Sequence, residues 1–227
     1  MLSQRRYSES EELLWIMVDL ARTSLKSTDR ATTKLACSLA RLMFKQGRFE
    51  DAENLWRMSL EIAQTRWGGE DSISLKAETG LARVLKSQGR LAESEALLRG
   101  NVEKLVRVRG EDSLTASTAM DFLGSLLMQD GRYADAVIWW ERCTKIRLLR
   151  LGPTDDKAFK TFSVLRECYL QLGRYNDALK SGQEWLEAAK KASGLNHIYV
   201  SQLQSLLETM LVEKLPNFQS DVPMRLL

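Results

Sequence analysis

Few residues of the sequence combine the types and spacing that catalysis or metal binding requires. His197 is the only histidine, which excludes a histidine-based catalytic triad or a site with several histidine ligands within this chain. The carboxylate pairs Glu11/Glu12 and Asp155/Asp156 are adjacent, so on a helix their side chains point in different directions. We interpret them as helix-capping residues. No glycine precedes Lys-Ser or Lys-Thr in the order of a phosphate-binding loop. The sequence therefore predicts no enzyme activity, no metal and no cofactor.

The three cysteines, Cys37, Cys143 and Cys168, are an odd number at no spacing typical of a metal site. Buried, unpaired thiols in a reducing compartment fit this pattern. The N-terminal residues lack the apolar segment of a signal peptide, and no apolar run reaches the roughly 18–20 residues of a membrane span. We therefore expect a cytoplasmic protein without membrane contact; the alternative is a piece of a longer chain that carries a targeting signal.

The charge balance is only mildly basic, with 33 Lys and Arg against 30 Asp and Glu, a net charge of +3. This excess is too small to predict binding to nucleic acid or to an anionic membrane. Helical repeats that recognise RNA have shorter units with paired specificity positions, and no positions of this sequence repeat in that way.

Eight of the 13 glycines recur every 21 residues. They are Gly47, Gly68, Gly89, Gly110, Gly131, Gly152, Gly173 and Gly194. Alternate glycines have different contexts. One context is Gly-Arg followed by an aromatic residue or leucine, as at residues 47–49, and the other is a turn containing Asp, Ser, Thr or Asn, as at residues 110–113. The repeat is therefore 42 residues long, and its first turn could register on Gly69 instead of Gly68.

Each 21-residue step predicts one helix and one turn. A glycine just after a helix adopts the left-handed conformation easily, and an Asp or Ser shortly afterwards caps the next helix. Small residues recur three positions after the aromatic residue or leucine and allow two helices to approach closely: Ala52, Ser94, Ala136 and Ala178. Such helix pairs cannot bury their apolar faces alone, so neighbouring pairs must stack into a solenoid. We call the helix before each Gly-Arg turn the first helix of its repeat and the helix after it the second.

The 21-residue spacing of the glycines also predicts how the chain is divided, with about ten helices in total. The divisions are the second helix of a truncated or capping repeat in residues 1–26, four 42-residue units in 27–194, a capping helix in 195–215 and a tail in 216–227. Because the chain starts within a repeat, we expect its first helix to leave an apolar face around Leu13, Leu14 and Ile16 uncovered.

Trp56 and Trp140 occupy the same position of the repeat, which favours a role in packing. Trp139 and Trp140 are adjacent and cannot face the same way on a helix, so we expect one of them to be more exposed.

The repeat resembles the tetratricopeptide repeats (TPR) of the kinesin light chain-like 42-residue type. That family has units of the form L-x-x-L-A-x-x-Y-x-x-Q-G-[KR]-Y-x-E-A-E-x-L, and residues 46–55 and 88–97 match it closely. The resemblance implies an all-α fold, a right-handed superhelical TPR solenoid of antiparallel helices, whose first helices line a concave groove that binds partner segments. Two asparagines that contact the peptide in kinesin light chains have no counterpart here, which argues against the same mode of peptide binding.

The resemblance also implies which residues face the groove, and in the first half of the chain many of these are cationic. The partner-binding candidates are Lys34, Arg41, Phe44, Lys45, Lys76, Arg83, Lys86 and Phe122. Six cations on one wall would attract an acidic segment, and the two phenylalanines would supply apolar anchors. The alternative interpretation is that these lysines and arginines form an ordinary solvated helix surface.

We therefore predict a non-enzymatic scaffold or adaptor that binds an acidic segment of a partner protein in the concave TPR groove. One alternative is the sensor or self-assembly region of a larger signalling protein, such as a nucleotide-binding receptor. Another is a homo-oligomer that forms through the unpaired terminal helix.

Overall fold

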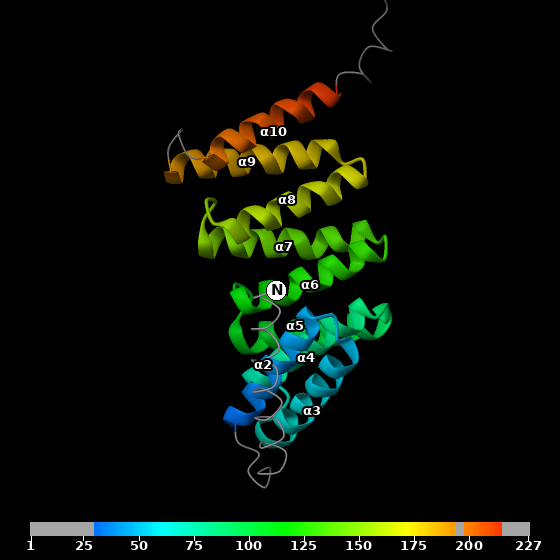
Figure 1. Ribbon diagram of the computed structural model, residues 1–227. Helices are drawn as coiled ribbons and strands as arrows, with labels where there is room; N and C mark the ends of the chain where they lie inside the picture. The colour runs from blue at the N-terminus through cyan, green and yellow to red at the C-terminus, as the bar shows by residue number, and fades with distance from the viewer. Residues whose placement is uncertain (1–29, 194–197, 215–227) are drawn as a thin grey trace, which may run out of the picture. The chain divides into compact units, whose positions relative to one another are not determined.

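The computed structural model describes residues 30–193 and 198–214, and in these ranges all regular secondary structure is α-helical (Figure 1). The nine helices found there are α2 (Arg30–Lys45), α3 (Phe49–Trp67), α4 (Ser72–Ser87), α5 (Leu91–Arg109), α6 (Leu114–Gln129), α7 (Tyr133–Leu151), α8 (Asp156–Gln171), α9 (Tyr175–Ser193) and α10 (Ile198–Lys214). The predicted N-terminal helix with Leu13, Leu14 and Ile16, the histidine His197 and the predicted tail lie outside the described residues.

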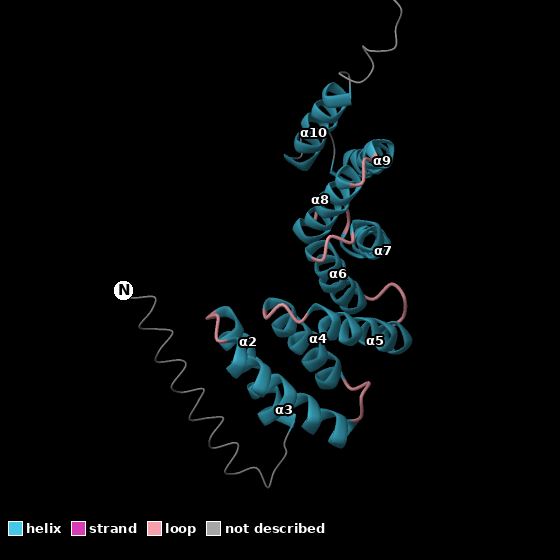
Figure 2. Ribbon diagram, turned by 90° about the vertical axis from the view of Figure 1, so that its right-hand side faces the viewer, coloured by secondary structure: helices cyan, strands magenta, loops and turns pink. Residues whose placement is uncertain are grey.

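The helix lengths follow the 21-residue spacing of the glycines. From α2 to α9 the helices alternate between 16 and 19 residues, and each pair with its two turns fills one 42-residue repeat. From α2 to α9, short loops join successive helices (Figure 2). This alternation confirms the predicted fold class, an all-α helical repeat.

The turn glycines hold conformations that other residues adopt only with strain. The structure describes seven of the glycines that recur every 21 residues, from Gly47 to Gly173, and all seven have positive φ. At Gly68, φ is 89° and ψ is 162°, which is a region almost restricted to glycine, and Gly110 has nearly the same angles. The first turn therefore registers on Gly68 rather than Gly69. At these two glycines φ is positive as predicted, but the extended ψ differs from the left-handed helical conformation that we expected.

The two kinds of turn start the next helix in different ways. After the second helices, an aspartate caps α4 and α8 as predicted: the Asp71 carboxylate accepts a hydrogen bond from the backbone N of Ile73 at 2.8 Å, and Asp155 accepts one from Lys157 N at 2.9 Å. After the first helices, the arginine of the Gly-Arg turn makes no side-chain cap and pairs instead with an acid three residues later. These pairs are Arg48–Asp51, Arg90–Glu93, Arg132–Asp135 and Arg174–Asp177.

The helices form two compact units, one ending at Leu126 and one beginning at Leu127. In the first unit, consecutive helices from α2 to α5 pack against one another, and α4 also contacts α2. Leu39, Met43 and Leu85 are completely or almost completely buried in its core. In the second unit, α7 to α10 pack consecutively, and the rings of Phe162 and Trp185 stack with centroids 5.0 Å apart.

The small residues and the shared tryptophans lie where the repeat predicts. Ala52, Ser94, Ala136 and Ala178 have no exposed surface, so the helices are in close contact at each of these positions. Ser94, the one polar member of this series, donates a hydrogen bond to the carbonyl of Ala82 on the neighbouring helix at 2.6 Å. Trp56 and Trp140 are buried, whereas Trp139 is only half-buried.

We expect Gly110→Ala to destabilise the protein because alanine is strained at φ 86° and ψ 162°, at a cost of about 1–3 kcal/mol. A Cβ at Gly110 meets nothing within 4 Å, so the loss would come from the backbone alone. Gly100 is the matched control: it lies inside α5, also with open space for a Cβ, and Gly100→Ala should stabilise the helix by about 0.5–1 kcal/mol. Urea unfolding followed by circular dichroism measures both changes. Equal stability of the two variants would contradict the argument.

Candidate partner-binding site

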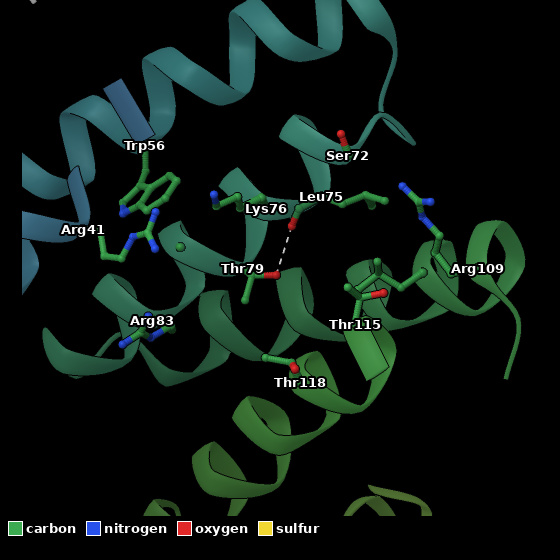
Figure 3. A pocket seen from close by; sticks show the side chains of 12 residues that line it. Arg41, Trp56, Ser72, Leu75, Lys76, Thr79, Arg83, Arg109, Thr115 and Thr118 are labelled. Carbon is green, nitrogen blue, oxygen red and sulfur yellow. Dashed lines mark hydrogen bonds between the residues drawn. The ribbon is translucent and has the colours of Figure 1, made fainter. Parts of the chain in front are cut away.

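A cavity of about 320 Å³ lies within the first unit and is lined from α2, α3, α4, α5 and α6 (Figure 3). Its lining residues are Arg41, Trp56, Ser72, Leu75, Lys76, Thr79, Gly80, Arg83, Leu105, Arg109, Thr115 and Thr118. The volume is at the lower end of the range for small-molecule pockets, which is enough for one side chain and its neighbours. Three of the eight predicted binding residues, Arg41, Lys76 and Arg83, line this cavity.

A glycine inside a helix allows the floor of the cavity to form. Gly80 lies in the middle of α4, where the other repeats carry Ser38, Phe122 and Val164. A Cβ built on Gly80 would lie 2.3 Å from the Trp56 ring, so the indole packs directly against the backbone of α4. Trp56 is only 4% exposed, so it contributes to the core and to the cavity floor together. The packing role predicted for Trp56 is confirmed by this burial.

The cavity is electropositive and no carboxylate lines it. Figure 3 shows Arg41, Lys76 and Arg83 toward one end and Arg109 at the other. Burial lowers the pKa of the Arg83 guanidinium below its ordinary value, and the positive charge of Arg41 lowers it further. Among the ion pairs of the described residues, none involves Arg41, Lys76 or Arg83. These charges are therefore available to an anionic ligand.

Both predicted phenylalanines contact Arg83. Its guanidinium carbon lies 4.8 Å from the ring centroid of Phe44 and 4.7 Å from that of Phe122. Phe44 is itself fixed by Phe49, with ring centroids 5.7 Å apart. Cation–π contacts with both rings hold the half-buried Arg83 side chain in place. In this arrangement the two phenylalanines orient a cation, a role that was not expected from the sequence.

The remaining predicted cations lie outside the cavity lining. Lys86 donates a hydrogen bond to the hydroxyl of Ser125 at 2.5 Å. Burial lowers the pKa of Lys86, while the nearby Asp121 raises it and Arg83 lowers it. Lys34 and Lys45 are exposed on α2, near the two ends of that helix. The structure thus brings together five of the eight candidates, Arg41, Phe44, Lys76, Arg83 and Phe122.

A buried polar network supports the cavity wall from behind. Glu78 is 3% exposed and accepts hydrogen bonds from Lys104 Nζ at 2.5 Å and from Asn101 Nδ2 at 2.9 Å. The Thr79 hydroxyl lies 3.1 Å from Asn101 Oδ1 and 3.0 Å from the Leu75 carbonyl. Because Lys104 already pairs with Glu78, this carboxylate does not compensate the cavity cations.

Sequence reasoning missed several lining residues, notably Arg109 and Thr115. Arg109 ends a second helix, and only first helices were expected to line the groove. The one signal that could have located the cavity is Gly80, because glycine inside a helix costs stability and therefore calls for a packing reason.

Thiol chemistry, metal binding and membrane insertion each place requirements on the described part of the chain. All three cysteines are buried and form no disulfide among the described residues; burial raises the pKa of Cys37, and it raises that of Cys168 to about 11. Within residues 30–193 and 198–214, no group of His, Cys, Asp and Glu side chains could hold a metal ion. Of the helices described, none has both the length and the apolar character to cross a bilayer.

The helix pairs and the groove-like cavity define a helical-repeat binding protein, and comparison with known proteins identifies the repeat. The tetratricopeptide repeat model matches residues 29–99, 73–148 and 114–191. The chain therefore belongs to the tetratricopeptide repeat family, whose members are typically non-enzymatic scaffolds that bind proteins or peptides. None of the curated proteins matches the sequence at a significant level.

Solved structures with the same fold include kinesin light chain-like proteins. BtubC (BKLC) from P. vanneervenii is 18% identical, with a TM-score of 0.69 over 91% of this chain and 82% of that chain. The putative kinesin light chain TPR-like repeats of Podosopora anserina are 17% identical, with a TM-score of 0.65 over 82% of this chain and 96% of that chain. A Rap protein complexed with Competence and Sporulation Factor is 13% identical, with a TM-score of 0.60 over 90% of this chain and 62% of that chain. At these identities the likeness shows the fold alone.

We expect Gly80→Ala to displace the Trp56 ring, because a Cβ there would be too close to the indole. The cost should be about 1–3 kcal/mol, as for other overpacked core sites. Chemical denaturation with Gly100→Ala as the matched control measures it, since that glycine has open space around it. Gly80→Ala as stable as the Gly100→Ala control would show that the ring is not packed on the α4 backbone.

Proposed function

We propose that this protein is an interaction scaffold that binds an acidic segment of a partner protein at the cavity between α2 and α6. The single observation that carries the proposal is the group of three cations, Arg41, Lys76 and Arg83, which form no ion pair with another described residue and have no carboxylate beside them in the cavity lining. A cluster of like charges that repel one another without compensation favours an anionic ligand, mainly through association rate and specificity. A solvated surface would not need to bury Arg83 between two rings.

The other predicted binding residues have a secondary role in this proposal. Lys34 and Lys45 extend the positive surface along α2, and Lys86 extends it along α4. They would guide an acidic segment toward the cavity without entering it. The buried thiols suit a protein that acts in the reducing cytoplasm.

The alternatives rest on residues that the structure does not describe. The homo-oligomer depends on Leu13, Leu14 and Ile16, and the sensor region of a larger signalling protein depends on the half repeat in residues 1–26. No observation on residues 30–193 or 198–214 favours either alternative over partner binding.

We expect the double variant Arg41→Glu/Arg83→Glu to lose binding of a labelled peptide rich in Asp and Glu, with affinity reduced at least about tenfold. Helical content should be retained, because the changes are at positions that are not fully buried. The wild-type protein should bind this peptide more tightly than its Asn/Gln counterpart, and more weakly as salt is added. Fluorescence anisotropy measures the affinities and circular dichroism the helical content.

The matched control is Lys180→Glu/Lys191→Glu, which changes the net charge equally on exposed positions of α9. This variant should bind the acidic peptide as the wild type does. If both double variants lose binding equally, net charge rather than the cavity determines affinity. If neither loses it, the acidic segment binds elsewhere or the proposal is wrong.

A further inference from the structure

The three cations at one end of the cavity exceed what one carboxylate can balance. Arg41 and Lys76 are both close enough to Cys37 for their charges to act on its thiol, and Arg41 also acts on Arg83. All three charged groups line the cavity, and Figure 3 shows them toward one end of it. A carboxylate brings one negative charge and two oxygens, so two of the three positive charges would stay uncompensated.

The restricted side chain of Arg83 favours binding of an oxyanion. The guanidinium carbon lies 4.8 Å from the ring centroid of Phe44 and 4.7 Å from that of Phe122, so both rings restrict the group, whose N–H donors lie in the guanidinium plane. A planar guanidinium presents its donors as a rigid fork that matches two oxygens of a carboxylate or phosphate. Because the rings already restrict the side chain, little further entropy is lost when the fork binds an anion.

We infer, building on the proposed function, that this end of the cavity binds a phosphorylated serine or threonine of the partner segment. A phosphomonoester carries about −1.5 to −2 charges near pH 7 and has three strong acceptor oxygens. Three oxygens allow Arg83 to bind through its fork while Arg41 and Lys76 each reach an oxygen. The dianion also relieves the repulsion between Arg41 and Arg83, which a single negative charge relieves only in part.

The shape of the cavity favours a protein segment as the source of the phosphate. Residues from α2 to α6 line the cavity, and its volume of about 320 Å³ can hold a side chain that projects from an extended segment. Bilayer phosphates lie in a plane and would meet only the rim. Beyond the cations, the largely buried Leu75 and Leu105 complete the apolar part of the cavity lining.

The test uses one extended peptide sequence in three forms, with phosphoserine, glutamate or serine at the central position, titrated into the full chain by anisotropy. We expect the phosphoserine form to bind at least about tenfold more tightly than the glutamate form. Arg83→Lys keeps the positive charge but loses the fork, so it should remove most of that preference. Phe122→Leu should reduce the preference because Arg83 is no longer held. Lys180→Gln/Lys191→Gln on α9 should leave it unchanged.

Further measurements distinguish a phosphorylated peptide from free phosphate and from a lipid. They also distinguish failure of the phosphate inference from failure of the acidic-segment proposal. Inorganic phosphate should compete only weakly, and vesicles of phosphatidylcholine with phosphatidic acid should not bind in an Arg83-dependent way. Equal affinity for the phosphoserine and glutamate peptides overturns the phosphate inference but leaves the acidic-segment function standing. Arg83-dependent vesicle binding without peptide preference overturns it in favour of a lipid. Failure of all three peptides to bind removes both proposals.

Discussion

The structure depends on the backbone conformation of the turn glycines, which fixes where each helix ends. Gly68 and Gly110 combine positive φ with extended ψ, and this conformation stops a 19-residue helix and turns the chain toward the next one. Constant helix lengths bring Ala52 and its counterparts to the same height in every repeat, where they are completely buried. With this register, each first helix occupies the same stretch of its repeat.

In this regular repeat scaffold, the features of the candidate site arise at positions where the repeats differ. Gly80 is glycine where the other repeats have Ser38, Phe122 and Val164, and the absent side chain lets the Trp56 ring reach the α4 backbone. Phe122, at the same position one repeat later, has a large ring that contacts Arg83 of the preceding first helix. One repeat position therefore provides both the cavity floor and a contact that orients its cation.

This division explains which features could be predicted from the sequence. The fold follows from elements that recur, such as the turn glycines and the buried small residues, so periodicity alone was sufficient. The cavity follows from single positions, and periodicity carries no information about them. Lys34 was grouped with Arg41 because both lie on one face of α2, yet seven residues of helix separate them by about 10 Å. Arg109 was missed because it reaches the cavity from the end of a second helix.

The mild net charge of +3 conceals how the charges are distributed. Many acids are paired with arginines at the turns or along the second helices, as in Arg48–Asp51 and Arg57–Glu53, and these exposed pairs add little stability. These acids compensate arginines that lie outside the cavity, and no carboxylate lines the cavity itself. The cations of the cavity therefore repel one another in the free protein, and Arg83 in addition loses part of its hydration. An anion that enters the cavity relieves this repulsion, so the unfavourable electrostatics of the free state become part of the driving force for binding.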